Sequence, residues 1–217
     1  MKDGRNIDSR QAFLDKSNLA QTGRKSMTRY ASEKYEGIVT CDDDNENILR
    51  KPTSFLHEEN WDQALLTIQK LHAVRHNILK GGAGLAAPQI GILLPIFIYT
   101  PDRTTENLID VINPSFEPMG TVTIEGYEAC FSEPLRCAKI KRWKHIKCRY
   151  QDLQGKWHEV VLQDFAAKVF QHEMDHLEGK LTVDHLSAEV ETFFDVQTFQ
   201  DYMAKVLLDD SKTYKPL

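Results

Sequence analysis

One stretch decides the fold that we expect for this sequence: Gln171-His172-Glu173-Met174-Asp175-His176-Leu177-Glu178-Gly179. Asp164 can cap a helix here and Gly179 can end it, so that His172 and His176 lie on one helical face. Two imidazoles four positions apart can bind one metal ion, and Glu173 between them can reach a water molecule on that ion. The alternative interpretation is a helix surface with two ordinary histidines.

The segments around this helix predict an α+β fold. An upstream helix runs from Asn60, with Gln63 placed as in a capping box, to Gly81, and a last helix runs from 187 to about 208. Five short β-like runs are found at 93–99, 108–112, 120–124, 140–150 and 157–162. We expect mainly antiparallel sheets packed around a central metal-binding helix, with an additional C-terminal helix.

These residues alone do not identify the third metal ligand. One class of zinc peptidase would place a histidine at position 182, which is Thr182 here, and another would use an acid such as Glu189 or Glu191. The remaining option is an upstream thiolate. The four cysteines, at 41, 130, 137 and 148, form no Cys-x-x-Cys pair, so we expect reduced thiols in a cytoplasmic protein.

Two upstream segments complete a pattern with the first stretch: Gly82-Ala83-Gly84-Leu85-Ala86-Ala87-Pro88-Gln89 and Glu128-Ala129-Cys130-Phe131-Ser132. In order and spacing the three segments resemble the motifs of peptide deformylase, Gly-x-Gly-Leu-Ala-Ala-Pro-Gln, Glu-Gly-Cys-Leu-Ser and His-Glu-x-Asp-His. The resemblance covers about residues 36 to 187. It implies metal-dependent hydrolysis of the N-formyl group from the N-terminal formylmethionine of newly synthesised proteins.

The resemblance also implies a role for each site residue. Cys130, His172 and His176 match the metal ligands, and Glu173 matches the general acid/base that acts on metal-bound water. Gln89 and the backbone N–H of Phe131 match the donors to the oxyanion. One divalent metal ion per chain is implied, Fe²⁺ in the cell, which Zn²⁺ or Ni²⁺ can replace on purification.

The implied substrate is an N-formylmethionyl nascent polypeptide. By the resemblance it lies as an extra strand beside Ala83, Gly84 and Ala129. Phe165 and Val169, two turns and one turn before His172, would line the methionine pocket, with core packing as the alternative.

Two departures from the family pattern leave the peptide preference beyond formylmethionine open. Ala129 stands where the family has glycine, which would strain the backbone if its φ were positive. Glu133 precedes Pro134 where the family has an apolar residue, and the segment continues to Cys137 with Arg136 one position early.

Composition and charge limit the other partners. The chain has 217 residues, with 27 Lys and Arg against 32 Asp and Glu and a net charge of −5, which argues against a specific DNA binder. We expect no membrane insertion and no secretory signal, because no apolar run is long enough. The sequence carries no signal for an oligomeric state.

Three regions are expected: a polar, poorly ordered extension at 1–35, a peptide deformylase-like catalytic domain at 36–187, and a C-terminal helix and tail at 188–217. A basic stripe at 136–149 predicts a strand whose charged face is solvated or touches the ribosome, and the basic 1–35 extension offers a second ribosome contact. Two alternative functions remain: a zinc metallopeptidase using His172 and His176, and a non-catalytic binder of formyl-Met peptides.

Overall fold

The computed structural model describes residues 36–104, 106–186 and 188–213, so the predicted extension at 1–35 lies outside the described residues. The described strands are β1 (Gly84–Ala86), β2 (Ile96–Tyr99), β3 (Ile109–Pro118), β4 (Thr123–Ala129), β5 (Arg136–Trp143), β6 (His145–Gln151), β7 (Trp157–Gln163) and β8 (Glu189–Thr192). The described longer helices are α2 (Trp61–Ala73), α3 (Asp164–Leu177) and α4 (Val196–Thr213). Shorter turns are Ile48–Arg50, Glu58–Asn60, Ala87–Ile90 and Thr182–Asp184, and a π-helical turn, Val74–Leu79, extends α2.

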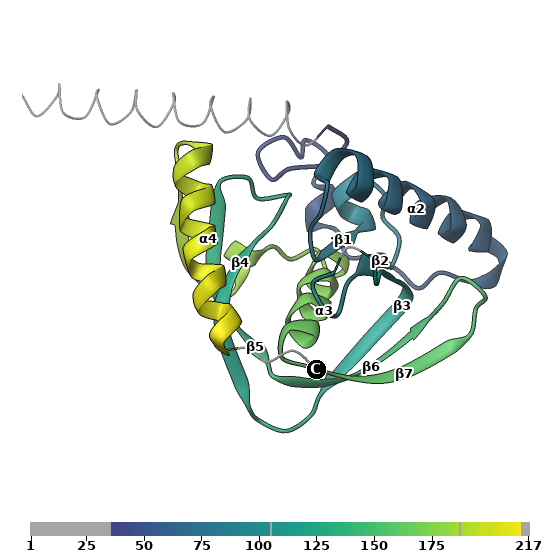
Figure 1. The fold of residues 1–217 in the computed structure, drawn as a ribbon. Helices are drawn as coiled ribbons and strands as arrows, with labels where there is room; N and C mark the ends of the chain where they lie inside the picture. Colours follow the sequence, from purple (N-terminus) through teal and green to yellow (C-terminus); the bar gives the residue numbers. More distant parts are fainter. Residues whose placement is uncertain (1–35, 105, 187, 214–217) are drawn as a thin grey trace, which may run out of the picture.

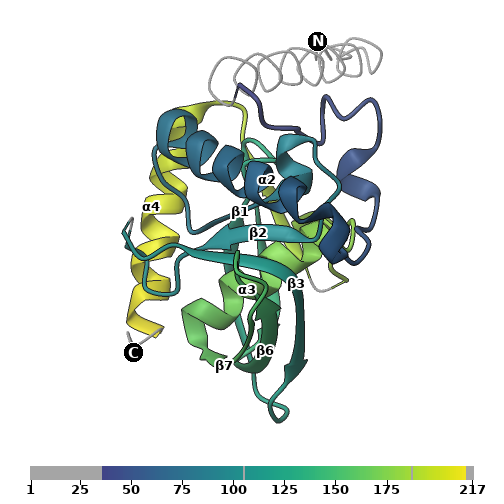
Figure 2. The same ribbon diagram turned by 90° about the vertical axis from the view of Figure 1, so that its right-hand side faces the viewer.

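The strands form two antiparallel sheets with α3 between them. One sheet has the order β1-β2-β3-β6-β7 and the other β4-β5-β8. Figure 1 shows α3 in the space between the sheets, and Figure 2 shows α2 on the other side of β1, β2 and β3. The predicted α+β fold with mainly antiparallel sheets around a central helix is therefore confirmed.

Strand β2 joins the two cores because its side chains alternate between the faces of the sheet. Ile96 and Ile98 pack with the apolar face of α2, whereas Phe97 and Tyr99 pack with α3. Phe170 of α3 meets the ring of Phe97 edge to face at 5.0 Å and that of Tyr99 at 5.7 Å. These contacts bury one face of α3 and fix its position in the middle of the fold.

The predicted strand over 140–150 is wrong, because the chain turns at Lys144 and continues in the other sheet. Lys144 N–H donates to Val122 O at 3.0 Å, and Lys144 O accepts from Asp164 N–H at 2.9 Å. The basic stripe at 136–149 is thus no continuous face. Its cations are partly paired within each sheet, as Lys141 with Glu125 at 3.3 Å.

The last helix starts later than predicted, at Val196 rather than 187. Residues Glu189–Thr192 instead form β8, which pairs antiparallel with β5. The edge of β5 offers unpaired backbone groups that a short extended segment can satisfy. The start of α4 follows from Asp195, whose carboxylate accepts the N–H of Thr198 at 2.8 Å.

Smaller differences concern caps and strand ends. Helix α2 begins after Asn60 as predicted, but the Gln63 amide donates to the Asn60 side chain at 3.1 Å in place of the predicted capping box. Strand β4 starts at Thr123 and runs to Ala129, later than the predicted run at 120–124. Among the described residues, no helix is long and apolar enough to cross a membrane.

The end of α3 depends on Gly179, which has φ +73 and lies against the backbone of Arg50. A Cβ at this position would come within 2.7 Å of Arg50 O, whereas a Cβ at Gly120, with φ +83, would meet nothing within 4 Å. We expect Gly120→Ala to lower the free energy of unfolding by about 1–2 kcal/mol, from positive φ alone. Gly179→Ala should cost about 1–3 kcal/mol more, from the added clash. Urea denaturation measures both, and equal losses would contradict this account.

Candidate functional site

Three potential metal ligands from two elements converge at the centre of the fold. His172 and His176 come from α3, and Cys130 directly follows β4; one ligand atom from each lies within 4.8 Å of the other two. Cys130 Sγ is 3.2 Å from His176 Nε2, and the two imidazole rings are 5.1 Å apart. The structure thus brings together the three residues that the sequence analysis assigned as ligands.

A buried ion pair orients the first histidine. Glu128 Oε2 accepts a hydrogen bond from His172 Nδ1 at 2.8 Å, which leaves Nε2 of that ring to face the cluster. Arg142 holds the Glu128 carboxylate with two hydrogen bonds of 2.9 and 2.8 Å, and donates a third, of 2.6 Å, to Asp175. Because both side chains are only 4% exposed, this pair fixes the imidazole rigidly.

Burial and neighbouring charges shift the pKa values of three groups at this site. Burial would raise the pKa of Glu128, but Arg142 overcomes that effect and holds the pKa well below its usual range. Burial lowers the pKa of His176 to about 3, so this imidazole is neutral and keeps a lone pair for a metal. Burial also raises the pKa of the Cys130 thiol, and binding of a cation would release its proton.

The donor set fits a transition metal. A thiolate and two imidazoles are ligands for zinc, iron or nickel rather than for magnesium or calcium, which prefer oxygen. Three protein ligands leave a coordination position open, as catalytic sites require. The three side chains of Cys130, His172 and His176 therefore suit a transition metal both in their chemistry and in their position close together inside the protein.

Glu173 lies beside this cluster in a buried position. Its Oε2 has no hydrogen-bond partner among the described residues, and burial raises its pKa to about 7. A bound dication would lower that pKa again. A Cβ on Gly84 would clash with the carboxylate of Glu173, so the glycine of the first motif leaves the space that this side chain occupies.

Gln89 is tied in place on the other side of Cys130. Its Oε1 accepts the N–H of Ala86 at 2.8 Å, and its Nε2 donates to Cys130 Sγ and to Ser132 Oγ, each at 3.3 Å. The side chain is 2% exposed. The amide N–H group is thereby directed toward the sulfur and the cavity rather than toward solvent.

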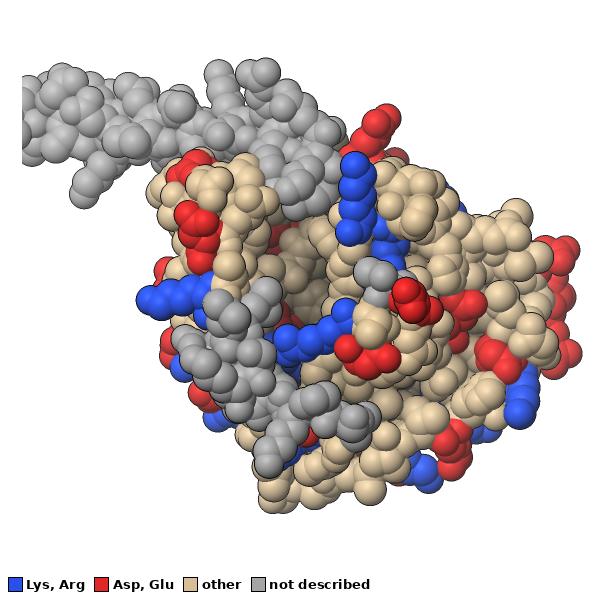
Figure 3. Space-filling view, viewed as in Figure 1, with Lys and Arg blue, Asp and Glu red and all other residues tan. Residues whose placement is uncertain are grey.

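The site opens into a cavity of about 380 Å³. Figure 3 shows a hollow between α4 and the rest of the protein. All residues to which the sequence analysis gave a catalytic or substrate role line the cavity: Ala83, Gly84, Gln89, Ala129, Phe131, Phe165, Val169 and Glu173. Of the predicted ligands, Cys130 and His172 line it as well.

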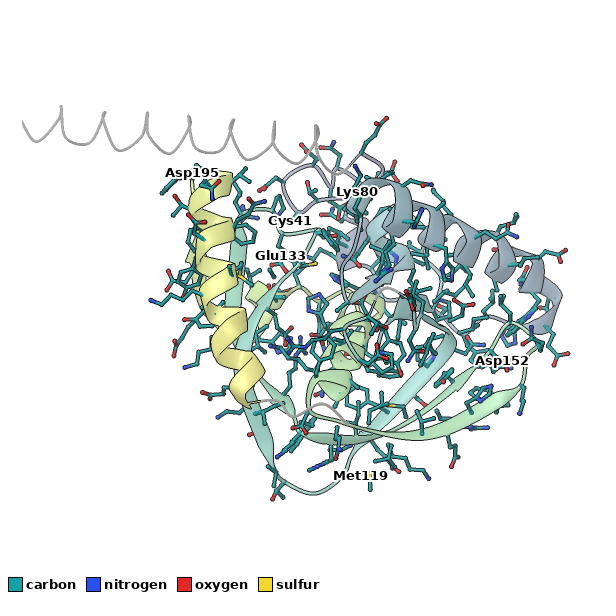
Figure 4. The ribbon with its side chains drawn as sticks, viewed as in Figure 1. Cys41, Lys80, Met119, Glu133, Asp152 and Asp195 are labelled. Carbon is teal, nitrogen blue, oxygen red and sulfur yellow. The ribbon has the colours of Figure 1, made fainter. Side chains whose placement is uncertain are left out.

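Both departures from the motif fit the structure. Ala129 is not among the residues with positive φ, so its methyl group strains no backbone. The buried carboxylate of Glu133 (Figure 4) accepts Thr182 N–H at 2.9 Å, Thr182 Oγ–H at 2.7 Å and Val183 N–H at 3.3 Å. Glu133 therefore joins the loop after Cys130 to the turn Thr182–Asp184.

The sequence analysis missed three contributions to the site and its cavity. Glu128 stood in a quoted motif two residues before Cys130 but received no role, and its position was the available signal. Arg142 was grouped with the basic stripe, although the alternation of strand residues places it on the face of Ile140 and opposite Lys139 and Lys141. Phe199 and Met203 of α4 also line the cavity, although the sequence analysis treated their helix as a separate tail.

This fold, with a possible metal site at Cys130, His172 and His176 beside a buried glutamate, is that of a metal-dependent hydrolase. The family model described as polypeptide deformylase matches residues 36–191. A peptide deformylase of Rickettsia prowazekii is 36% identical over 157 residues, covering 69% of this chain and 86% of that protein.

Solved structures agree. The peptide deformylase of Thermotoga maritima has a TM-score of 0.61 at 34% identity, over 69% of this chain and 96% of that one. The Met-Ala-Ser-bound class I type b peptide deformylase of Acinetobacter baumannii also has a TM-score of 0.61, at 27% identity, over 69% of this chain and 96% of that one.

The chain belongs to the peptide deformylase family. It is a metal-dependent hydrolase that removes the N-formyl group from newly synthesised proteins.

The buried pair of Glu128 and Arg142 can be tested against a surface pair on the same strand. Glu128→Gln should lower the free energy of unfolding by about 3–5 kcal/mol, because the buried Arg142 loses one of its two carboxylate partners, Glu128 and Asp175. It should also weaken zinc binding about 10- to 100-fold.

Glu125→Gln is the matched control, because the Glu125 carboxylate is 49% exposed and pairs with the surface lysines Lys139 and Lys141. This variant should lower the free energy of unfolding by at most about 1 kcal/mol and leave zinc affinity unchanged. Urea denaturation and a zinc-chelator competition measure the two effects. Equal behaviour of both variants would show that the buried pair does not orient His172.

Proposed function

We propose that Cys130, His172 and His176 bind one divalent metal ion and that Glu173 is the general acid/base of formyl hydrolysis. The observation that carries this proposal is that the three ligands form one cluster beside the cavity. Glu173 and the fixed amide of Gln89 line that same cavity. When bound, the metal polarises the formyl carbonyl and lowers the pKa of a water molecule from 15.7 to about 7.

We propose Fe²⁺ as the metal in the cell, with Zn²⁺ and Ni²⁺ as replacements. A thiolate with two imidazoles accepts all three ions, and which of them occupies such a site in the cell depends on geometry, ligand type and metal availability rather than on affinity alone. The buried position of Cys130 supports the choice of an oxidisable ion, since it protects both sulfur and metal.

Glu173 moves the proton in the reaction. Its carboxylate takes a proton from the attacking water as oxygen adds to the formyl carbon, and later gives that proton to the departing amine as the C–N bond breaks. Formate then leaves with the new oxygen, and the peptide leaves with a free amino group. Burial of Glu173 keeps bulk water from this proton, so that the transfer stays within the site.

Gln89 and Phe131 stabilise the negative oxygen that develops on the formyl group. The Gln89 amide is fixed by Ala86 N–H and donates from Nε2, and the backbone N–H of Phe131 is the proposed second donor. Donors held in place before the reaction cost no reorganisation, and removal of one typically slows such reactions about 10²- to 10³-fold.

The proposed substrate is a formylmethionyl chain extended beside Ala83, Gly84 and Ala129. Phe165 and Val169 of α3 form the proposed methionine pocket. Both side chains line the cavity, which supports a substrate role for them besides core packing. The Acinetobacter relative that holds Met-Ala-Ser supports a peptide in this place.

The proposed compartment is the cytoplasm, and free thiols support it. All four cysteines are unpaired, and Cys130 must stay reduced to act as a ligand. Burial raises the pKa of Cys137 to about 11, which makes that thiol unreactive. Ribosome contact through 1–35 stays a prediction, whereas the divided 136–149 segment gives it no continuous surface.

The role of Glu173 predicts a loss of chemistry without a loss of metal. Glu173→Gln should reduce formate release from formyl-Met-Ala-Ser about 10²- to 10⁴-fold while zinc content stays at the wild-type level. Glu178→Gln, an exposed change five residues along the same chain segment, is the control and should retain full activity. Undiminished formate release by Glu173→Gln would contradict the proposed acid/base role of Glu173.

The thiolate ligand separates this proposal from a zinc peptidase. Cys130→Ala should lose bound metal and the rise in Tm on zinc addition, since binding to the folded state stabilises it. The control is Cys137→Ala, a buried thiol on the neighbouring strand. Full metal content in Cys130→Ala would favour a peptidase site with an acidic third ligand, yet Glu189 and Glu191 lie exposed on β8.

A further inference from the structure

Helix α4 contributes to the cavity although it follows the segment that the family model matches. That match ends at residue 191, whereas Phe199 and Met203 of α4 line the same cavity as Phe165, Val169 and Glu173. Figure 1 shows α4 standing beside β4. This wall therefore comes from a part of the chain outside the matched family segment.

The contacts that precede α4 tie the helix to the sheet. Strand β8 pairs with β5, and Phe193 N–H donates to Leu135 O at 2.9 Å. Tyr202 then packs edge to face on Tyr127 of β4 at 5.6 Å and lies 5.1 Å from the ring of Phe193. A helix held by a strand pairing and three aromatic rings is a fixed wall rather than a loose tail.

The sequence of α4 places its apolar residues toward the protein. Phe199, Tyr202, Met203 and Val206 are half-buried at helical spacing, whereas Gln200 and the other residues between them are exposed. Tyr202 contacts β4, and Phe199 and Met203 reach the cavity. The surface that α4 presents to a substrate is therefore apolar.

The strand against which this wall packs leads away from the reacting centre. Tyr127, against which α4 packs, precedes Cys130 by three residues of an extended chain, which is about 10 Å. A peptide that runs beside β4 with its formyl group at the metal ligands extends in this direction with its second and third residues. Val169 remains close to the first residue, since it lies one turn before His172 on α3.

We propose that Phe199 and Met203 form a second, apolar subsite that selects formylated chains with a large aliphatic or aromatic side chain at the second or third residue. This inference rests on the proposed function, because it places the formylmethionine at the Cys-His-His centre. We expect the preference in KM more than in kcat, because contacts that are equally strong in the ground state and the transition state change KM alone.

The test compares formyl-Met-Ala-Ser with formyl-Met-Phe-Ser and formyl-Met-Ala-Phe, using the full-length, zinc-loaded protein. The wild type should favour one of the phenylalanine peptides about 10-fold in kcat/KM. Met203→Ala should reduce that preference about 5-fold, because the truncated side chain leaves part of the subsite uncovered. Met203→Glu should shift preference toward formyl-Met-Ala-Lys or formyl-Met-Lys-Ser by adding a charge to the wall.

Lys205→Ala is the matched control, an exposed change on the same helix that should leave the preference as it is in the wild type. Equal kcat/KM for all peptides in the wild type would overturn the subsite. So would a Met203→Ala variant that slows every peptide by the same factor, because Met203 would then only hold α4 in place.

Product binding separates this inference from the proposed chemistry. Calorimetry with Met-Phe-Ser, Met-Ala-Phe and Met-Ala-Ser needs no turnover, so a preference for phenylalanine that Met203→Ala removes would support the subsite even in an inactive Glu173→Gln protein. Absence of formate release from every peptide would instead contradict the proposed chemistry. Equal affinities for the three products would overturn the subsite alone.

Discussion

The ion pair between Glu128 and Arg142 is the interaction on which the site depends. Glu128 lies on β4 and Arg142 on β5 of the smaller sheet, while their partners His172 and Asp175 lie on α3. The hydrogen bonds that join this pair to His172 and Asp175 tie the smaller sheet to α3, so a shift of the sheet relative to α3 would separate buried charged groups that stabilise one another. The same constraint sets the orientation of a metal-ligating imidazole.

The cavity follows from this arrangement of two sheets around one helix. At its chemical end, Gly84 admits the Glu173 carboxylate and Gln89 is tied to the backbone and to Cys130. Elsewhere α4 closes one side with the apolar residues Phe199 and Met203. Rigid chemistry at one end and an apolar wall at the other suit an enzyme that must accept many chains but act on one group.

The sequence predicted most of the reacting groups, because their information is local. His172, Glu173 and His176 lie within two helical turns, so helical spacing alone puts them together. Cys130 and Gln89 needed the resemblance, since no local pattern links residues so far apart along the chain. The turn at Lys144 escaped prediction, because an alternating pattern continues through it while the chain changes sheets. Strand β8 escaped prediction as well, because a short charged segment becomes a strand only beside the free edge of β5.

The sequence by itself therefore determined the metal-binding helix, the order of the motifs and the class of reaction, because spacing along one helix and residue chemistry are properties of the chain. Tertiary structure alone decided that Arg142 is buried with Glu128 and that Glu133 holds Thr182. It also decided that α4 forms a wall of the cavity. Each of these depends on which distant surfaces meet, and burial changes a charged or apolar side chain from a solvated group into a structural one.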